Sequence, residues 1–398
     1  MTAKTNSTVP EDNAMHQQFL DHQDDDNQYL KTLMSDAGQP SISIILATSP
    51  GPILMESDRD RLEAHTNTAV KRVITEWGIR KARLLSDGIS HALSVTDSIQ
   101  PTEGLAVMVN TKRSDVVTLR HRPIERLVVD PTFATRDLHY DHIYHPTYRV
   151  LVASFGGFRI LEGHDRNLAD VRIPGPQGPR CLPAGRAKYH QDHRSKGRPD
   201  RSATQAKAGR STLSAVIDTL RLLPARPLVV IAPSRIRGTL TGQQLNADLL
   251  IGTIDANYLH ATPRIIANFV TPAVMSWLGE STGHQLDRLN RAGRSGRLVY
   301  GIDASWRAAL TGRARHLWVA TDYQPYGTVD PNGVDIHPAA VRDAPNVIYD
   351  LADDLIEVVC LMGGNATQLP ADAFPSGYPP IAAMVERGSV QRIQRTVS

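Results

Sequence analysis

The sequence predicts an α/β protein built from several domains, and three observations lead to this prediction. The chain has 398 residues, which is too long for one ordinary hydrophobic core. Short apolar, β-branched runs alternate with longer segments that carry apolar residues at three- and four-residue spacing, as helices on a sheet do. The apolar content of 41% is normal for a globular protein and too high for a disordered one.

The first predicted domain covers residues 1–144. A polar helix is expected over residues 13–34, followed by a buried strand in SISIILATSP (41–50). A second helix follows, which Ser57 or Asp60 could cap. Its apolar stripe consists of Leu62, Val70, Val73, Ile74 and Trp77. GLAVMVNT (104–111) reads as another buried strand, and residues 116–130 continue in β character.

The second predicted domain covers residues 145–285. In YRVLVASFGGFRILEG (148–163), two β-rich runs flank Gly156-Gly157, a pattern that predicts a hairpin because glycine tolerates the positive φ angles of a tight turn. A basic loop (175–210) follows. A helix over residues 211–223, a strand PLVVIAP (227–233) and a longer helix over residues 263–289 complete this domain.

The third predicted domain covers residues 286–398. It is expected to contain a helix at residues 304–311 and the strand HLWVATD (316–322). A second helix within residues 346–370 would carry Ile348, Leu351, Leu355 and Val358 on one face and stop at Gly363-Gly364. IAAMVER (381–387) reads as a last strand. We therefore expect a mixed sheet with packed helices in each domain.

Composition and short patterns limit the cellular compartment and the classes of function that we expect. No run approaches 18 apolar residues, and the polar N-terminus lacks the apolar core of a signal peptide, so neither a membrane span nor a targeting segment is expected. The two cysteines, Cys181 and Cys360, fit a reducing cytoplasm better than a disulfide framework. The phosphate-binding pattern GxxxxGK[ST] is absent, so we do not expect the chain itself to hydrolyse nucleotides.

The most unusual stretch is PRCLPAGRAKYHQDHRSKGRPDRSATQAKAGR (179–210). It contains nine Lys or Arg residues and two Asp residues, a balance of +7, whereas the whole chain balances at +3. Between Leu182 and Leu213 there is no Val, Ile, Leu, Met, Phe or Trp. Such a segment cannot bury enough apolar surface to order itself in water, but its cations could contact phosphates and its aromatic rings could stack on unpaired bases. A solvated loop without a partner is the alternative.

The chain resembles the class-1 release factors of archaea and eukaryotes and their relative Pelota, in the bacterial branch that includes the hibernation factor Balon. The resemblance rests on SISIILATSP with its following helix and GLAVMVNT, on YRVLVASFGGFRILEG followed by LADVRIPGP, and on LDRLNRAGRSGRLVYGIDASWRAALTGRARHLWVATD with DLIEVVCLMGGNATQLP. It covers nearly the whole chain.

The resemblance implies a monomeric, tRNA-shaped protein that occupies the ribosomal A site. The first domain would lie near the decoding centre, the middle domain would reach the peptidyl-transferase centre, and the third, similar to kink-turn-binding proteins, would meet a translational GTPase. For a bacterial member it implies the 70S ribosome and elongation factor Tu as partners, and it leaves open another hibernation factor as a further partner.

Hydrolytic members of this family carry Gly-Gly-Gln in the loop after the strand that corresponds to LADVRIP. This sequence has no Gly-Gly-Gln. Gly175-Pro176-Gln177 is the nearest imitation in that loop, and Gly242-Gln243-Gln244 lies too far along the chain. We therefore expect a non-enzymatic ribosome-binding hibernation factor, without catalytic residues, cofactor or metal. The alternatives are a peptidyl-tRNA hydrolase or rescue factor that uses Gln177 or a loop histidine such as His193, and an RNA-binding module unrelated to ribosomes.

The expected RNA-binding residues all lie in the basic loop. They are Arg180, Arg186, Lys188, Tyr189, His190, His193, Arg194, Lys196, Arg198, Arg201, Lys207 and Arg210. Two further basic groups could serve the same end or be ordinary surface. They are Lys71, Arg72, Arg80, Lys81 and Arg83 in the first domain, and Arg288, Arg291, Arg294 and Arg297 near the start of the third.

Two possible metal sites are less well supported by the sequence than the RNA-binding loop is. His139, His142 and His145 are three apart, but Pro146 and the strand after it favour an extended linker, in which these positions share no face. Asp130, Asp137, Asp141 and Asp170 could suggest a two-metal nuclease, but nothing fixes their spacing, and surface acids are common. Cys181 has basic neighbours but no identified catalytic partner, so we regard it as incidental.

Overall fold

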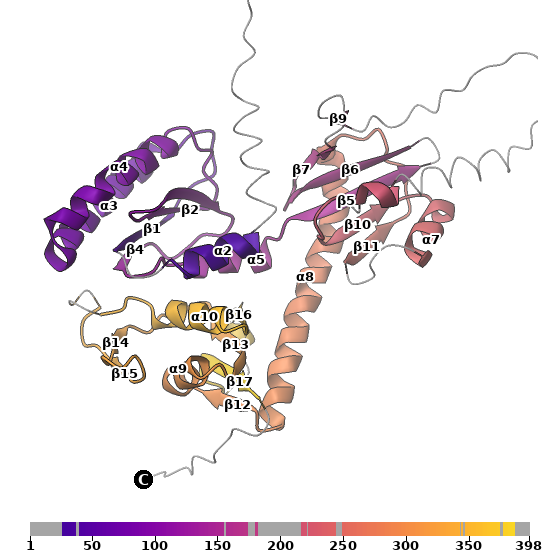
Figure 1. Cartoon of the computed structure of the whole chain (residues 1–398). Helices are drawn as coiled ribbons and strands as arrows, with labels where there is room; N and C mark the ends of the chain where they lie inside the picture. The colour runs from indigo at the N-terminus through magenta and orange to yellow at the C-terminus, as the bar shows by residue number, and fades with distance from the viewer. Residues whose placement is uncertain are drawn as a thin grey trace, which may run out of the picture. The chain divides into compact units, whose positions relative to one another are not determined.

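The structure is a computed structural model of the protein, and it is a mixed α/β fold with one main sheet in each of three successive parts of the chain (Figure 1). It describes residues 26–36, 40–154, 157–173, 180–181, 216–220, 222–243, 249–342, 344, 347–374 and 377–386. The chain forms two compact units. His145–Thr282 belong to one unit, and Asp25–Tyr144 and Gly283–Ser398 together belong to the other. The assignment of three domains remains a prediction.

The first sheet lies in residues 41–130 and is entirely antiparallel, in the order β3-β2-β1-β4. Its strands are β1 (Ser41–Ala47), β2 (Gly104–Val109), β3 (Ser114–Leu119) and β4 (Arg126–Asp130). All seven residues of β1 are buried, because both faces of the sheet are covered. α3 (Glu56–Trp77) and α4 (Ile79–Thr96) pack on one face, and α2 (Asp26–Met34) and α5 (Arg136–Tyr144) pack on the other.

α3 and α4 form a helical hairpin whose turn is Gly78, at a φ of 88°. Glycine adopts this left-handed backbone easily, so the chain can reverse there without strain. The expected caps were wrong. Ser57 and Asp60 lie inside α3, and Met55 is the N-cap residue, with no side-chain cap hydrogen bond.

The sheet of the second unit has the order β11-β10-β5-β6-β7. Its strands are β5 (Tyr148–Ser154), β6 (Gly157–His164), β7 (Asn167–Asp170), β10 (Leu228–Ile231) and β11 (Leu250–Ile254). The predicted hairpin is confirmed, since β5 and β6 pair antiparallel up to Ser154 and Gly157. α8 (Pro263–Arg294) covers one face, while the helix of residues 216–220 and α7 (Ser234–Gln243) cover the other.

A two-stranded ladder follows this sheet. β8 (Arg172–Ile173) pairs antiparallel with β9 (Arg180–Cys181). The next described residues after β9 are those of the helix at 216–220.

The third sheet has the order β12-β17-β13-β16, so the last strand is an inner one. The strands are β12 (Leu298–Tyr300), β13 (Ala314–Ala320), β16 (Asn365–Leu369) and β17 (Ile381–Val385). α9 (Ile302–Leu310) and α10 (Leu351–Leu361) pack on one face, and Leu351 and Leu355 of the stripe predicted for the second helix lie in the core. Ile348 was predicted to lie on this second helix, but it precedes α10 and forms a β-bridge with Gly327. Gly327 belongs to β14 (Gly327–Val329), which pairs with β15 (Ile336–Pro338).

The segment around residues 137–148 corrects the sequence analysis. We predicted an extended linker, but residues 136–144 form α5. Pro146 disfavours a helical conformation only for the residue before it, so α5 can run as far as Tyr144. Among the described residues, no helix is both long and apolar enough to cross a membrane.

Candidate functional site

The predicted RNA-binding loop lies almost entirely outside the described residues. Arg180 belongs to β9, where its backbone pairs with Ile173 of β8. The rest are outside, namely Arg186, Lys188, Tyr189, His190, His193, Arg194, Lys196, Arg198, Arg201, Lys207 and Arg210. Their role remains a prediction from the sequence.

The described part of the chain presents a second basic surface at the tip of the α3–α4 hairpin. Lys71, Arg80 and Arg83 are exposed there, and none of them forms an ion pair with another described residue. Arg72 pairs with Glu76 at 3.1 Å, so its charge is partly balanced. Beside these cations is a hollow with an apolar floor, lined by Val70, Ile74, Ile79, Ala82, Arg83, Ser86, Ile89 and Ser90. Unpaired cations next to exposed apolar groups suit contact with phosphates and base faces.

The other basic group is divided between surface and interior. Arg291 and Arg294 are exposed at the end of α8. Arg288 instead packs its guanidinium 6.0 Å from the centre of the Trp318 ring and lies 3.1 Å from Nδ1 of His316. Burial, with the charge of Arg288, lowers the pKa of His316 to about 3. Arg288 is therefore half-buried and contacts His316 and Trp318, whereas Arg291 and Arg294 face solvent.

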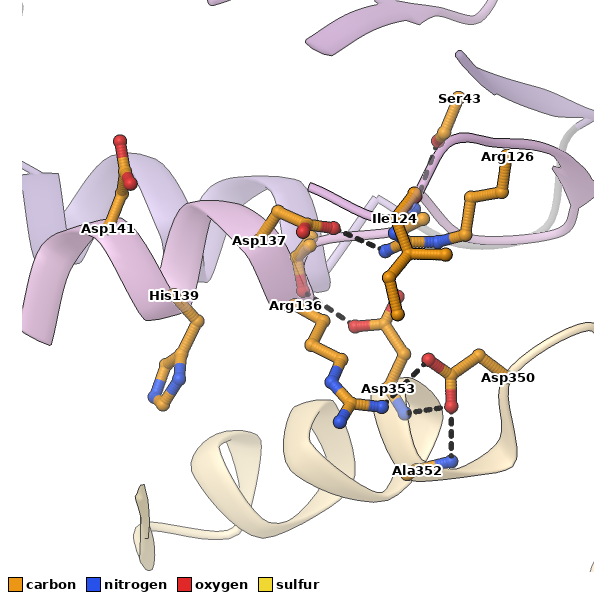
Figure 2. Close-up of polar contacts among 12 residues, drawn as sticks. Ser43, Ile124, Arg126, Arg136, Asp137, His139, Asp141, Asp350, Ala352 and Asp353 are labelled. Carbon is orange, nitrogen blue, oxygen red and sulfur yellow. Dashed lines mark hydrogen bonds and ion pairs between the residues drawn. The ribbon is translucent and has the colours of Figure 1, made fainter. Parts of the chain in front are cut away.

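The most elaborate polar site of the described residues joins α5 to α10 and the edge of the third sheet (Figure 2). At its centre is Arg136, which is 3% exposed. Its side chain donates five hydrogen bonds, which use all the N–H groups of a guanidinium. The acceptors are Oε1 of Gln368 (2.9 Å), Oδ2 of Asp350 (3.0 Å) and the backbone oxygens of Ala320 (2.7 Å), Thr321 (3.0 Å) and Tyr323 (2.7 Å).

Neighbouring side chains reinforce this connection. The Thr135 hydroxyl donates to Oε1 of Glu357 at 3.0 Å and is 3.5 Å from Oδ1 of Asp353. The Gln368 amide donates back to the carbonyl of Arg136 at 2.8 Å, and the Tyr144 hydroxyl donates to the carbonyl of Gln368. Because each partner is more than 200 residues away in sequence, these contacts fasten the parts Asp25–Tyr144 and Gly283–Ser398 to each other within their unit.

A second layer of charge lies behind Arg136. Arg126, which is 2% exposed, forms an ion pair with Asp137. Burial would raise the pKa of Asp137, but Arg126 and His121 outweigh it and lower that pKa to about 2. His121 lies between Asp137 (3.2 Å) and Asp141 (2.6 Å). Burial opposes its charge, yet the two carboxylates raise its pKa to about 9.

α10 faces this layer with more carboxyl groups than there are cations to balance them. Asp350 caps the helix by accepting from the backbone N–H groups of Ala352 and Asp353. Burial, together with Asp350, raises the pKa of Asp353 to about 8 despite Arg126 and Arg136. Burial and neighbouring carboxyls also hold the pKa values of Asp354 and Glu357 well above their ordinary values. Burial therefore favours the protonated form of these three groups.

The two metal-site readings gain no support from this geometry. His139 is in a helix but is buried, and its pKa is lowered to about 4 by burial and by His142 and Arg136. Asp137 and Asp141 are buried and pair with cations, contrary to the expectation of surface acids. Across the described residues, no three His, Cys, Asp or Glu side chains are arranged to hold a metal ion.

Sequence reasoning did not select the residues of the α5–α10 contact. Arg136, Asp350, Asp353, Glu357 and Gln368 are separated by long stretches of chain, and none belongs to a recognisable motif. One signal was present. DLADDLIE places acids at 350, 353, 354 and 357, one stripe of a helix that is otherwise strongly apolar and therefore buried.

No known family model matches the sequence, and no curated protein matches it. Several solved structures do. The archaeal translation termination factor aRF1 is 13% identical, with 91% of this chain and 97% of that chain covered and a TM-score of 0.22. Dom34 of S. cerevisiae, described as a translation termination-like factor that interacts with Hbs1, is 12% identical over 70% and 73% of the two chains, with a TM-score of 0.38. Archaeal Pelota, from a model of its ribosome-bound form with ABCE1, is 9% identical over 91% and 94%, with a TM-score of 0.36. The chain is thus similar to release-factor-like proteins, at a level too low to carry an argument about function.

Proposed function

We propose that this protein is a non-enzymatic ribosome-binding factor that occupies the vacant A site and lays residues 179–210 along ribosomal RNA near the peptidyl-transferase centre. The observation that carries the proposal is the charge of that segment. It holds +7 in 32 residues, while the rest of the chain is slightly acidic. A strong local cation density without apolar anchors suits an RNA partner, because each phosphate contact releases counterions.

The described residues add a second surface of the same chemistry. The exposed cations Lys71, Arg80 and Arg83 lie at the tip of a rigid helical hairpin. In the arrangement that the sequence resemblance implies, this domain would meet RNA near the decoding centre while the basic loop reaches the catalytic centre.

We further propose that the factor acts in the cytoplasm, as a monomer, in ribosome hibernation under stress or cold. Delivery to the 70S ribosome would depend on a translational GTPase, elongation factor Tu in bacteria, with another hibernation factor possible as a partner. These points rest on the sequence resemblance. The absence of Gly-Gly-Gln supports a blocking role over peptide release.

Co-sedimentation with 70S ribosomes tests the binding. We expect the full chain to pellet with ribosomes, and a variant with residues 183–210 replaced by a Gly/Ser linker of equal length to stay in the supernatant. A control variant in which the exposed, ion-paired Arg307 and Arg315 become Gln should still pellet. Equal pelleting of the linker variant and the full chain would refute the role of the loop.

Peptide release separates the proposal from the hydrolase alternative. Ribosomes carrying peptidyl-tRNA are incubated with the protein, and we expect no release above background. Fast release that is lost in Gln177→Ala or His193→Ala would make the protein an enzyme and overturn our assignment.

A further inference from the structure

We propose that the contact between α5 and α10 is a proton-sensitive latch, which holds Asp25–Tyr144 against Gly283–Ser398 while the side chains of Asp353, Asp354 and Glu357 are protonated and loosens when they ionise. The proposal concerns a conformational device and does not depend on ribosome binding.

The arrangement of the acidic residues on α10 makes such a pH-dependent contact possible. Asp350, Asp353, Asp354 and Glu357 follow one another at spacings of three, one and three residues, so they share a face of the helix. Asp350, Asp353 and Glu357 are 3–4% exposed. They contact Arg136 and Thr135 of the other part of the unit. Figure 2 shows the Arg136 side chain reaching toward Asp350 across the contact, whereas Asp137 points to Arg126.

The charges around this face do not balance. α5 contributes Arg136 and Asp137, and β4 contributes Arg126 and Asp130. α2 contributes Lys31, whose charge reaches Cys360 on α10. Further back, His121 and Asp141 adjoin Asp137, and Arg72 and Glu76 of α3 act on Asp130. The part Asp25–Tyr144 thus brings acids as well as cations, whereas α10 brings four acids, so full ionisation would leave a buried excess of negative charge.

The sign of the effect follows from linkage. When the two parts separate, the carboxyl groups of Asp353, Asp354 and Glu357 enter water and ionise at their ordinary pKa of about 4. When they dock, the carboxyl groups hold their protons to higher pH, so docking takes up protons. The latch is therefore tightest at low pH and loosens as pH rises from about 4 to about 8. The opening constant can grow up to about tenfold per pH unit for each carboxyl group that is protonated only in the docked form.

Hydrogen exchange of the full chain, read by mass spectrometry between pH 5.5 and 8.5 and corrected for intrinsic exchange, tests this. Peptides covering residues 132–144 and 351–361 should lose protection at least tenfold as pH rises. Peptides covering β1, β13 and, in the other unit, β5 should change less than threefold. This contrast distinguishes opening of the latch from unfolding. Equal loss over β1 and β13 would overturn the proposal, as would an unchanged profile at 132–144.

Two variants sharpen the test. Asp354→Asn with Glu357→Gln keeps size and hydrogen-bond acceptors but removes two ionisable groups. Since only Asp353 still titrates, the pH profile should become clearly shallower than that of the wild type, and protection at pH 8 should increase. The matched control, Asp335→Asn, removes an exposed acid that pairs with Arg307, and it should keep the wild-type profile. A profile in the double variant as steep as that of the wild type would refute the carboxyl mechanism. If circular dichroism shows that the double variant does not fold, the exchange profiles of the wild type and of the single variant Asp354→Asn decide whether the proposal holds.

Discussion

Replacing Arg136 by methionine should destabilise the unit formed by Asp25–Tyr144 and Gly283–Ser398 more than any exposed arginine can. The substitution removes five hydrogen-bond donors and leaves Asp350 without its buried partner. Breaking a buried ion pair by removing one partner costs about 3–5 kcal/mol. The three backbone carbonyls that lose their donor support the upper part of this range.

Urea unfolding followed by circular dichroism and by tryptophan fluorescence measures this loss. With a slope of about 3 kcal/mol per molar urea, the midpoint of this unit should fall by roughly 1 M or more. Arg136→Lys should fall between wild type and Arg136→Met, because an ammonium keeps the charge but cannot form the planar fork.

The control is Arg307→Met, which breaks an exposed ion pair with Asp335 in the same unit. Such pairs are worth about 0–1 kcal/mol. If Arg136→Met shifts the midpoint no further than Arg307→Met does, then Arg136 does not fasten the two parts and the reasoning from Figure 2 is refuted.

Three further predictions follow from other parts of the molecule. Changing Arg80, Lys81 and Arg83 together to Ala should lower the slope of log affinity for ribosomes against log salt by about 2, and an unchanged slope would exclude the hairpin tip from the RNA contact. In thermal unfolding, His121→Gln should lower the free energy of unfolding by roughly 2 kcal/mol at pH 6 and by little at pH 10. The reason is that the pKa of His121 is raised to about 9, so its contribution to stability is complete below about pH 6.5 and is lost as pH rises through 9. A loss of stability that does not depend on pH would contradict the charge on His121. Gly163→Ala would place a Cβ 1.8 Å from the carbonyl oxygen of Asn167 and should destabilise the protein by about 1–3 kcal/mol or more. Gly279→Ala lies in open space on α8 and should stabilise the protein by about 0.5–1 kcal/mol. The unfolding midpoints of the two variants should therefore move in opposite directions.

The main strands and helices were predictable because their signals are local. The apolar run of β1, the hairpin of β5 and β6 and the stripe of α10 each lie within one window of sequence. Helix ends were less well predicted. Ser57 and Asp60 are good capping residues by type, but α3 begins at Glu56, one residue before Ser57, so both lie inside the helix.

α5 shows why a local argument failed. Its sequence, RDLHYDHIY, has a weak apolar stripe, and Pro146 follows closely. The helix is stabilised by long-range contacts: Arg136 and Tyr144 bind groups of the third sheet, and Asp137 and Asp141 bind Arg126 and His121. The partners of Arg136 and Tyr144 are more than 200 residues away, so no window of sequence contains both members of these pairs, and their burial could not be foreseen. The predicted RNA-binding loop, by contrast, depends on charge alone and stays a prediction.

The strand order of the third sheet has a consequence during synthesis. β17, one of the last described elements, inserts between β12 and β13, which are made much earlier. Until a nascent chain has extended through Val385, β12 and β13 have no strand between them, and the carbonyls that receive Arg136 belong to an incomplete sheet. The part Asp25–Tyr144 must therefore wait, with Arg136 hydrated, until the chain has been translated through Val385 before it can dock.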